Sequence, residues 1–204
     1  MGHDLTRHPE SVLGVEVPVP FSPERMKPLS TSAREGRVNP KGIPCLYLAT
    51  NKETAIAEVR PWVGLYVSVA QFKTLKGLTL IDCSVEHAKD FVFYVEEPDE
   101  AERDKAVWAN IDRAFSEPLN PDESTADYAP TQIIAEAFRR DGIDGIMYKS
   151  ALGEGLNIAL FDINAADVMN CSLYMVKSVS FKFDETANPY FVKKHYADSG
   201  KSNA

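Results

Sequence analysis

The sequence has few cysteines, no long apolar run and no start that resembles an export signal. Its three cysteines, Cys45, Cys83 and Cys171, lie far apart among 204 residues, without the close pairs of zinc sites and disulfide-rich scaffolds. We expect them to be buried thiols in a reducing compartment. No window approaches the roughly 18 apolar residues of a membrane span, and no apolar run follows a positive segment at the start. These absences predict a soluble cytoplasmic protein with no metal site and no membrane partner.

Basic residues are also in short supply. Lysine and arginine number 22 against 30 aspartates and glutamates, which gives a net charge of −8. A protein this acidic lacks the basic surface that binds nucleic acid or anionic membranes. A phosphorylated ligand would therefore have to be held by a few placed cations. The negative charge also suits a basic protein partner, although solubility alone explains it.

The length and the composition are those of one globular domain, with 44% apolar and 25% charged residues. Strand and helix patterns are mixed without regular βαβ alternation, which favours an α+β fold. Residues 1–35 contain five prolines and are predicted to form an extended arm. Residues 36–183 are expected to form the folded domain, and residues 184–204 a polar tail.

Apolar periodicity and capping residues place the individual elements. Asn51 or Thr50 is expected to cap a short helix that Pro61 ends, because proline cannot continue a helix. Strands are expected at 44–49, 66–72, 78–82, 145–148, 157–163, 173–176 and 179–183, and helices at 53–60, 99–115 and about 130–141. In the last helix, the residues expected to face inward are Ile133, Ile134, Ala137 and Phe138.

The common nucleotide-binding and hydrolase motifs are absent. The sequence contains no G-x-G-x-x-G fingerprint and no G-x-x-x-x-G-K-[ST] loop, so neither a Rossmann site nor a P-loop is expected. It also contains no G-x-S-x-G elbow and no H-E-x-x-H, which argues against ordinary serine hydrolases and zinc peptidases. Gly153 and Gly155 are expected to form only a turn between two strands.

Arg37 lies in a turn rich in glycine, asparagine and proline, just before a predicted buried strand. There its guanidinium would be held by the strand yet exposed at the sheet edge. The planar fork could then bind a phosphate or a carboxylate through two hydrogen bonds. Taken alone, the residue is more often a solvated or salt-bridged arginine.

Glu58 lies among small and apolar residues in the predicted helix 53–60, which suggests a half-buried carboxylate in need of a partner. It could accept a sugar hydroxyl or stabilise a cationic transition state, or it could pair with Arg60 or Arg37. Tyr47 points away from its strand neighbours, so its ring would face whatever Arg37 faces. Taken alone, it is more often a core tyrosine.

Three further residues carry weaker signals. Ser150 lies in the loop before the glycine turn and is uninformative by itself. Tyr128 and Gln132 flank a predicted helix start, where backbone amides can receive an anionic group. Capping and packing explain such residues as well.

Five stretches of the sequence follow the order of one family's motifs. They are GRVNPKGIPCLYLA from Gly36, TAIAEVR from Thr54, YAPTQIIAE from Tyr128, GIDGIMYKSA from Gly142 and NIALF from Asn157. Together they span residues 36–163 and resemble the RES domain, a family named for its Arg, Glu and Ser. That family is found as the toxin of bacterial toxin–antitoxin pairs.

The resemblance implies a fold similar to that of ADP-ribosyltransferases, with a central split β-sheet and flanking helices, and an activity that consumes NAD+. The family's arginine, tyrosine, glutamate and serine, which are its catalytic residues, fall on Arg37, Tyr47, Glu58 and Ser150. The expected substrate-binding residues are Arg37, Tyr47, Asn39, Ser150 and Asn157. NAD+ is then a consumed substrate and not a cofactor, and a cognate antitoxin protein is the expected partner.

Each of these residues has an expected role in cleaving the nicotinamide–ribose bond. Arg37 lies near the pyrophosphate, and Tyr47 packs against the nicotinamide or its ribose. Glu58 binds the ribose hydroxyls and stabilises an oxocarbenium-like centre, while Ser150 orients the substrate. Water as acceptor gives a glycohydrolase, phosphate a phosphorylase and a protein side chain an ADP-ribosyltransferase. A catalytically silent binding module is the remaining alternative, and the sequence leaves the oligomeric state open, a homo-oligomer included.

Overall fold

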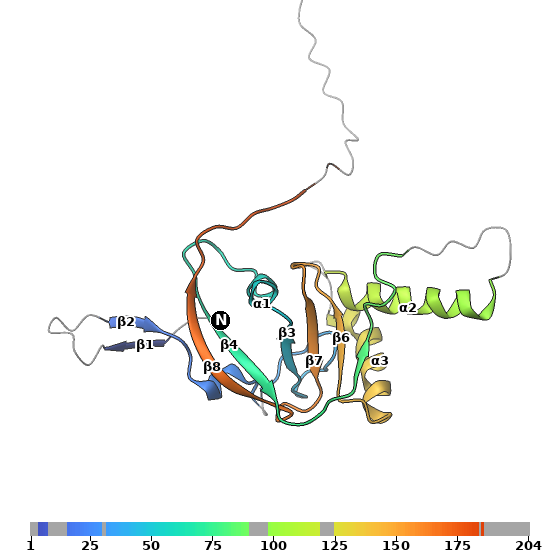
Figure 1. Ribbon diagram of the computed structural model, residues 1–204, viewed down its shortest axis with the longest axis horizontal. Coiled ribbons are helices and arrows are strands. Elements are labelled where there is room, and N and C mark those ends of the chain that lie inside the picture. The colour runs from blue at the N-terminus through green and yellow to red at the C-terminus, as the bar shows by residue number, and fades with distance from the viewer. Residues whose placement is uncertain are drawn as a thin grey trace, which may run out of the picture.

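The structure is a computed structural model, and it describes residues 4–7, 16–29, 32–89, 98–118, 125–183 and 185. A mixed four-stranded sheet lies between a long two-stranded sheet on one side and two helices on the other (Figure 1). A short hairpin near the N-terminus, β1 with β2, projects beside the two-stranded sheet (Figure 1). The arrangement confirms the predicted α+β class.

The described residues form eight strands and three α-helices, with two short 3-10 helices between them. The strands are β1 (Asp4–Arg7), β2 (Glu16–Val19), β3 (Leu46–Ala49), β4 (Tyr66–Thr74), β5 (Leu80–Asp82), β6 (Gly145–Lys149), β7 (Leu156–Leu160) and β8 (Ala166–Met175). The helices are α1 (Lys52–Glu58), α2 (Glu100–Ser116) and α3 (Ala129–Arg140), and the 3-10 helices are η1 (Pro23–Met26) and η2 (Thr125–Tyr128).

The four-stranded sheet has the order β3-β7-β6-β5. β7 pairs antiparallel with both β3 and β6, whereas β5 and β6 run parallel. The register places Tyr47 opposite Ala159, and Asn157 opposite Tyr148. Residues that lie opposite each other, or two apart along a strand, share a face of the sheet. These four side chains therefore lie on one face.

That face is covered by α2 and α3 (Figure 1). Phe115 of α2 and Ala135 of α3 are fully buried there against Ile146 of β6. Trp108 and Phe138 stack with their ring centroids 6.4 Å apart, which joins the two helices. Because burial of a large apolar side chain contributes about 1.5–3 kcal/mol, the helices provide fixed positions for the loops that contact them.

β4 and β8 form a long antiparallel pair over the opposite face (Figure 1). Leu46, Leu160 and Ala166 form a second core cluster there, with Phe72 of β4 packed against it. α1 follows β3 directly and contacts β3, β4 and β7. The last residue of α1 can therefore reach the end of the central sheet.

α1 is capped as the sequence predicts but ends two residues before the predicted end at Arg60. Asn51 is the N-cap residue, and its Oδ1 accepts a hydrogen bond from the backbone N–H of Thr54 at 2.8 Å. The helix ends at Glu58. Arg60 then adopts a left-handed conformation with φ 46°, immediately before Pro61.

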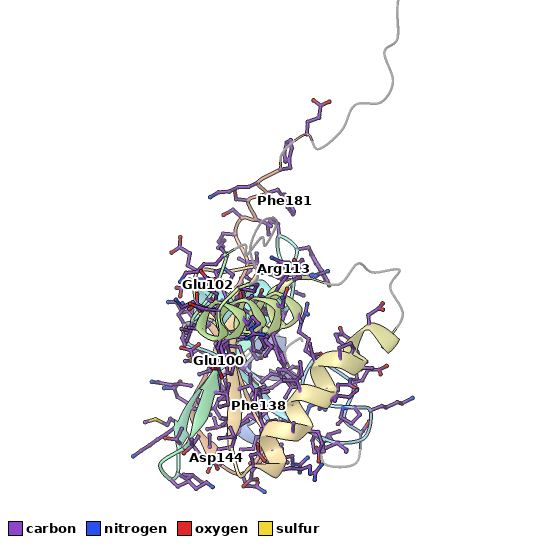
Figure 2. All side chains as sticks on the ribbon, turned by 90° about the vertical axis from the view of Figure 1, so that its right-hand side faces the viewer. Glu100, Glu102, Arg113, Phe138, Asp144 and Phe181 are labelled. Carbon is purple, nitrogen blue, oxygen red and sulfur yellow. The ribbon has the colours of Figure 1, made fainter. Side chains whose placement is uncertain are left out.

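The C-terminal strands differ from the prediction. β8 begins at Ala166 and not at residue 173, because its pairing with β4 compensates for a polar stretch that hides the strand pattern. The predicted strand at 179–183 is absent, and Phe181 is 80% exposed in a segment that leaves the body of the protein (Figure 2). Alternating apolar residues make a strand only where a neighbouring strand is available to pair.

α3 presents the predicted face only in part. Ile134 and Phe138 pack against the core as predicted, whereas Ile133 and Ala137 are exposed and Thr131 and Ala135 are buried. This orientation directs Gln132 toward the turn that precedes β3, where its side chain bonds two carbonyl oxygens. A polar tie to a distant segment thus decides the orientation of the helix.

The cysteines are all free thiols. Burial raises the pKa of Cys45 to about 11 and that of Cys83 to about 12, which keeps both protonated and unreactive. The prediction of buried thiols is confirmed for these two, whereas Cys171 is only half-buried. Among the described residues, no cluster of metal-ligating side chains is present, and no helix is long and apolar enough to cross a membrane.

Candidate active site

Glu58, the last residue of α1, is the centre of a hydrogen-bonded cluster. Its Oε1 accepts one hydrogen bond from Ser150 Oγ at 2.7 Å and another from Asn157 Nδ2 at 2.6 Å. The structure thus brings together three predicted site residues that are 92 and 99 positions apart. With Oε1 held by two neutral donors, the carboxylate has a fixed orientation, and its Oε2 has no partner among the described residues.

The surroundings of Glu58 correct two details of the sequence interpretation. Glu58 is exposed, not half-buried, because α1 ends at the rim of the sheet. It forms no ion pair with Arg60 or Arg37 in the described part of the chain. The carboxylate is therefore open to a ligand from solvent while it stays anchored from behind.

Ser150 holds Glu58 through its hydroxyl and is buried, with 5% of its surface exposed. Its Oγ donates to Glu58 and accepts from the backbone N–H groups of Leu152 and Gly153, at 3.1 and 3.0 Å. Because its single proton already points at Glu58, the geometry gives Ser150 a positioning role. That role differs from the direct contact with substrate that the resemblance implies.

The loop that carries Ser150 lies tightly against the first turn of α1. Gly155 donates its N–H to Thr54 Oγ1 at 3.0 Å, and Thr54 is fully buried. A Cβ at Gly153 would lie 2.6 Å from Thr54 Oγ1, and one at Gly155 would lie 2.6 Å from Asn51 Nδ2. The glycine turn is therefore required for close packing, and this packing sets the distance from Ser150 to Glu58.

We expect Gly155→Ala to lower the free energy of unfolding by about 1–3 kcal/mol, the usual cost of overpacking a tight contact. Its new methyl group would overlap three polar atoms at the start of α1, which belong to Thr50, Asn51 and Thr54. Urea unfolding curves test this. Gly77→Ala is the matched control, since a Cβ at Gly77 meets nothing within 4 Å. Equal stabilities of the two variants would contradict the tight fit.

Tyr47 is fixed at its hydroxyl and open at its ring. The hydroxyl donates to Asn39 Oδ1 at 2.7 Å and accepts from the backbone N–H of Val38 at 3.1 Å. Burial raises the pKa of this phenol, so it stays protonated. The residue is nevertheless 43% exposed. A Cβ at Gly36 would lie 2.6 Å from the Tyr47 hydroxyl, so only glycine leaves room for it.

Asn39 is 2% exposed and uses its whole side chain inside the protein. Its Nδ2 donates to the carbonyl oxygens of Arg34, Pro40 and Ile43, and its Oδ1 accepts from Tyr47. Asn39 was expected to bind substrate. In this geometry it acts by holding the turn and the Tyr47 phenol in place.

Arg37 is half-buried and contacts the C-terminal end of α2. Its Nη1 donates to the carbonyl oxygen of Ala114 at 2.8 Å, and its Nη2 donates to that of Glu117. Carbonyl groups at a helix C-terminus carry partial negative charge, which favours a cation there. The sequence predicts a guanidinium held by the strand, whereas the structure shows one held by a helix 77 residues away.

Tyr148 lies close enough to Glu58 and Arg37 to feel both charges, and the sequence interpretation missed it. It is the register partner of Asn157 on the sheet face that also carries Tyr47. Burial raises the pKa of its phenol, Glu58 raises the pKa further, and Arg37 lowers it. Both charged residues therefore act on this phenol. Strand alternation from Ile146, which puts Tyr148 on the inner face of β6, was the available signal.

Gln132 and Tyr128 hold structural positions at the start of α3. Gln132 Nε2 donates to the carbonyl oxygens of Gly36 and Asn39, at 2.9 and 3.1 Å, which ties α3 to the turn around Arg37. Tyr128 is the N-cap residue of α3 but makes no side-chain capping bond. Beside this tie lies a groove of about 890 Å³, whose lining includes neither Arg37, Tyr47 nor Glu58.

The candidate site thus consists of the anchored, solvent-open Glu58 carboxylate, the Arg37 guanidinium at the end of α2, and two tyrosines, Tyr47 and Tyr148, on one face of the sheet. The RES domain family model matches residues 17–184, and the chain belongs to the RES domain family. The family is associated with NAD-related enzymatic activity. No curated protein matches the chain. The match begins inside the predicted N-terminal arm and ends beside the predicted tail.

Proposed function

We propose that the protein cleaves the nicotinamide–ribose bond of NAD+, with water or inorganic phosphate as acceptor, and that it acts as the toxin of a toxin–antitoxin pair. The observation that supports this most is the Glu58 carboxylate. One of its oxygens is held by Ser150 and Asn157, and the residue is open to solvent. Membership of the RES domain family, which is associated with NAD-related enzymatic activity, supports NAD+ as the substrate.

The proposed chemistry places positive charge on the ribose. The bond between C1′ and the nicotinamide nitrogen breaks, and its electron pair leaves with neutral nicotinamide. C1′ becomes oxocarbenium-like and then takes an oxygen from water, which loses a proton to solvent, or from phosphate. An ionised Glu58 attracts this centre more strongly in the transition state than in the ground state, which lowers the barrier. The reaction uses no metal ion and consumes NAD+.

Tyr47 and Arg37 suit the remaining parts of the substrate. The half-exposed ring of Tyr47 can stack on the flat, cationic nicotinamide, and its fixed hydroxyl keeps the ring in one orientation. Arg37 bonds α2 with two donors of the five that a guanidinium has. The others have no partner among the described residues and can bind the pyrophosphate.

An ADP-ribosyltransferase that modifies a protein is the second candidate. The exposure of Glu58 favours it, because a macromolecular acceptor needs an open reaction centre. We also propose that the fold is similar to that of ADP-ribosyltransferases, and such a similarity would agree with this second candidate. A cognate antitoxin that covers the same opening, or a homo-oligomer, would limit access to the carboxylate.

The test is NAD+ consumption by the purified protein, with and without phosphate, with the products separated by chromatography. Free nicotinamide together with ADP-ribose identifies a glycohydrolase. Free nicotinamide together with ADP-ribose that carries a phosphate on the former C1′ identifies a phosphorylase. Transfer of label from NAD+ to protein identifies the second candidate. Protein that is folded, free of a bound partner and unable to consume NAD+ would overturn the proposal in favour of a silent binding module.

Arg37→Lys should raise the NAD+ concentration needed for half-maximal rate about tenfold, because lysine lacks the planar fork. Initial rates over a range of NAD+ concentrations measure this. Arg60→Lys is the control, because it makes the same charge-conserving substitution at an exposed residue outside the cluster. An unaltered concentration dependence for Arg37→Lys would place the pyrophosphate elsewhere.

A further inference from the structure

The hydroxyl of Tyr148 has no hydrogen-bond partner in the part of the chain that the structure describes. The residue is 6% exposed, and its ring packs against Phe115 with centroids 5.7 Å apart. Among the described residues, the fully buried side-chain oxygens that lack a hydrogen-bond partner belong to Glu86 and Asp112. The hydroxyl of Tyr148 is not among them. The small exposed part of Tyr148 therefore includes its hydroxyl, at the surface of the site.

Packing explains the ring of Tyr148 but not its hydroxyl. Buried tyrosines normally place their O–H groups on a partner, as Tyr47 does with Asn39. A phenylalanine would fill the same space against Phe115. The hydroxyl thus has no structural use among the described residues, which is the condition expected of a group that binds a ligand.

The neighbours of this hydroxyl define what it could bind. Tyr148 is directly opposite Asn157, whose amide donates to Glu58, and two residues before Ser150, which also donates to Glu58. Directly opposite residues on antiparallel strands have Cβ atoms about 4.5–5.5 Å apart. The phenol and the carboxylate thus belong to one cluster, which agrees with the influence of Glu58 on the phenol.

The two groups are complementary in their hydrogen bonding. The phenol carries a proton at neutral pH, because burial and Glu58 both raise its pKa and outweigh the opposite effect of Arg37. It is therefore a donor. Glu58 Oε2 has no partner among the described residues and is an acceptor. A donor beside an acceptor fits two adjacent hydroxyls, one of which accepts from the phenol while the other donates to the carboxylate.

We propose that Tyr148 binds one of the two hydroxyls of the nicotinamide ribose, while Glu58 binds the other. This assignment rests on the proposed function and makes Tyr148 a substrate-contacting residue beside the glutamate. Held at both hydroxyls, the ribose ring would present C1′ to the carboxylate in one orientation, and such positioning accounts for much of an enzyme's rate gain.

The test is Tyr148→Phe, which removes only the hydroxyl. Since that hydroxyl has no partner among the described residues, the variant should unfold within about 2 °C of the wild type. Its kcat/KM for NAD+ should fall at least about tenfold, the effect of losing one good hydrogen bond in the transition state. Tyr47→Phe is the matched comparison, because it removes two internal hydrogen bonds and should lower the unfolding temperature by about 5 °C.

Two NAD+ analogues, lacking the 2′- or the 3′-hydroxyl of the nicotinamide ribose, identify the contact. With one of them, wild type and Tyr148→Phe should have equal kcat/KM. A folded Tyr148→Phe that matches the wild type on NAD+, or a tenfold loss that persists with both analogues, overturns the assignment and leaves the proposed function standing. Wild-type protein that neither consumes NAD+ nor binds it by calorimetry overturns both.

Discussion

Glu58→Gln should lower the rate of NAD+ consumption at least about 100-fold, the usual effect of removing a charge or dipole that stabilises a transition state. The glutamine is nearly the same shape and keeps a side-chain oxygen that can accept from Ser150 and Asn157. What it loses is the negative charge beside C1′. Chromatographic measurement of nicotinamide release under saturating NAD+ gives the rate.

The stability of Glu58→Gln should differ from that of the wild type by less than about 1 kcal/mol, because the residue is exposed and keeps its two hydrogen bonds. Glu53→Gln is the matched control. It makes the same substitution on the same helix, at an exposed residue whose ion pair with Lys52 is exposed too. Glu53→Gln should retain the wild-type rate. A folded Glu58→Gln that releases nicotinamide at that rate would sink the electrostatic role.

Local signals in the sequence were sufficient for α1 and for the class of fold. The side chain of Asn51 and the proline at residue 61 act on their own neighbours, so a reader of the sequence can place the helix between them. The resemblance likewise identified Glu58 and Ser150 as members of one site. It could not show that the serine proton points at the glutamate, because that depends on the fit of the glycine loop against Thr54.

Contacts between distant segments were beyond the sequence. Arg37 reaches carbonyl oxygens at the end of α2, 77 residues away, and nothing in its local turn indicates a helix end as its partner. The orientation of α3 depends in the same way on the bonds from Gln132 to the preceding turn. Tyr148 was missed because a tyrosine in a short apolar run has the pattern of a core residue. Only the tertiary structure shows that its hydroxyl has no hydrogen-bond partner in the described part of the chain.

The tie between Asn39 and the turn gives the second large effect that we expect. Asn39→Asp should lower the free energy of unfolding at pH 7 by about 3 kcal/mol or more. The substitution puts a carboxylate oxygen where Nδ2 now donates to three carbonyl oxygens, 2.7–3.2 Å away. A buried carboxylate oxygen that faces only acceptors is strongly unfavourable. The other carboxylate oxygen would still accept from the Tyr47 hydroxyl, but the loosened turn beneath Tyr47 should lower NAD+ turnover together with stability.

The same argument predicts how the loss in Asn39→Asp depends on pH. A buried carboxyl among acceptors favours the protonated form, so its pKa in the folded state lies above the value of about 3.9 in the unfolded state. The variant is then least destabilised below about pH 4, and it loses stability as the pH rises toward the folded-state pKa. Urea unfolding at pH 4 and pH 7, each against the wild type, measures this difference.

Asn170→Asp is the matched control, because the exposed amide of Asn170 donates to Gln71. Its free energy of unfolding should differ from that of the wild type by less than about 1 kcal/mol at both pH values. A loss in Asn39→Asp that is equal at the two pH values would show that the buried charge is not its cause and that the lost hydrogen bonds of Nδ2 account for it.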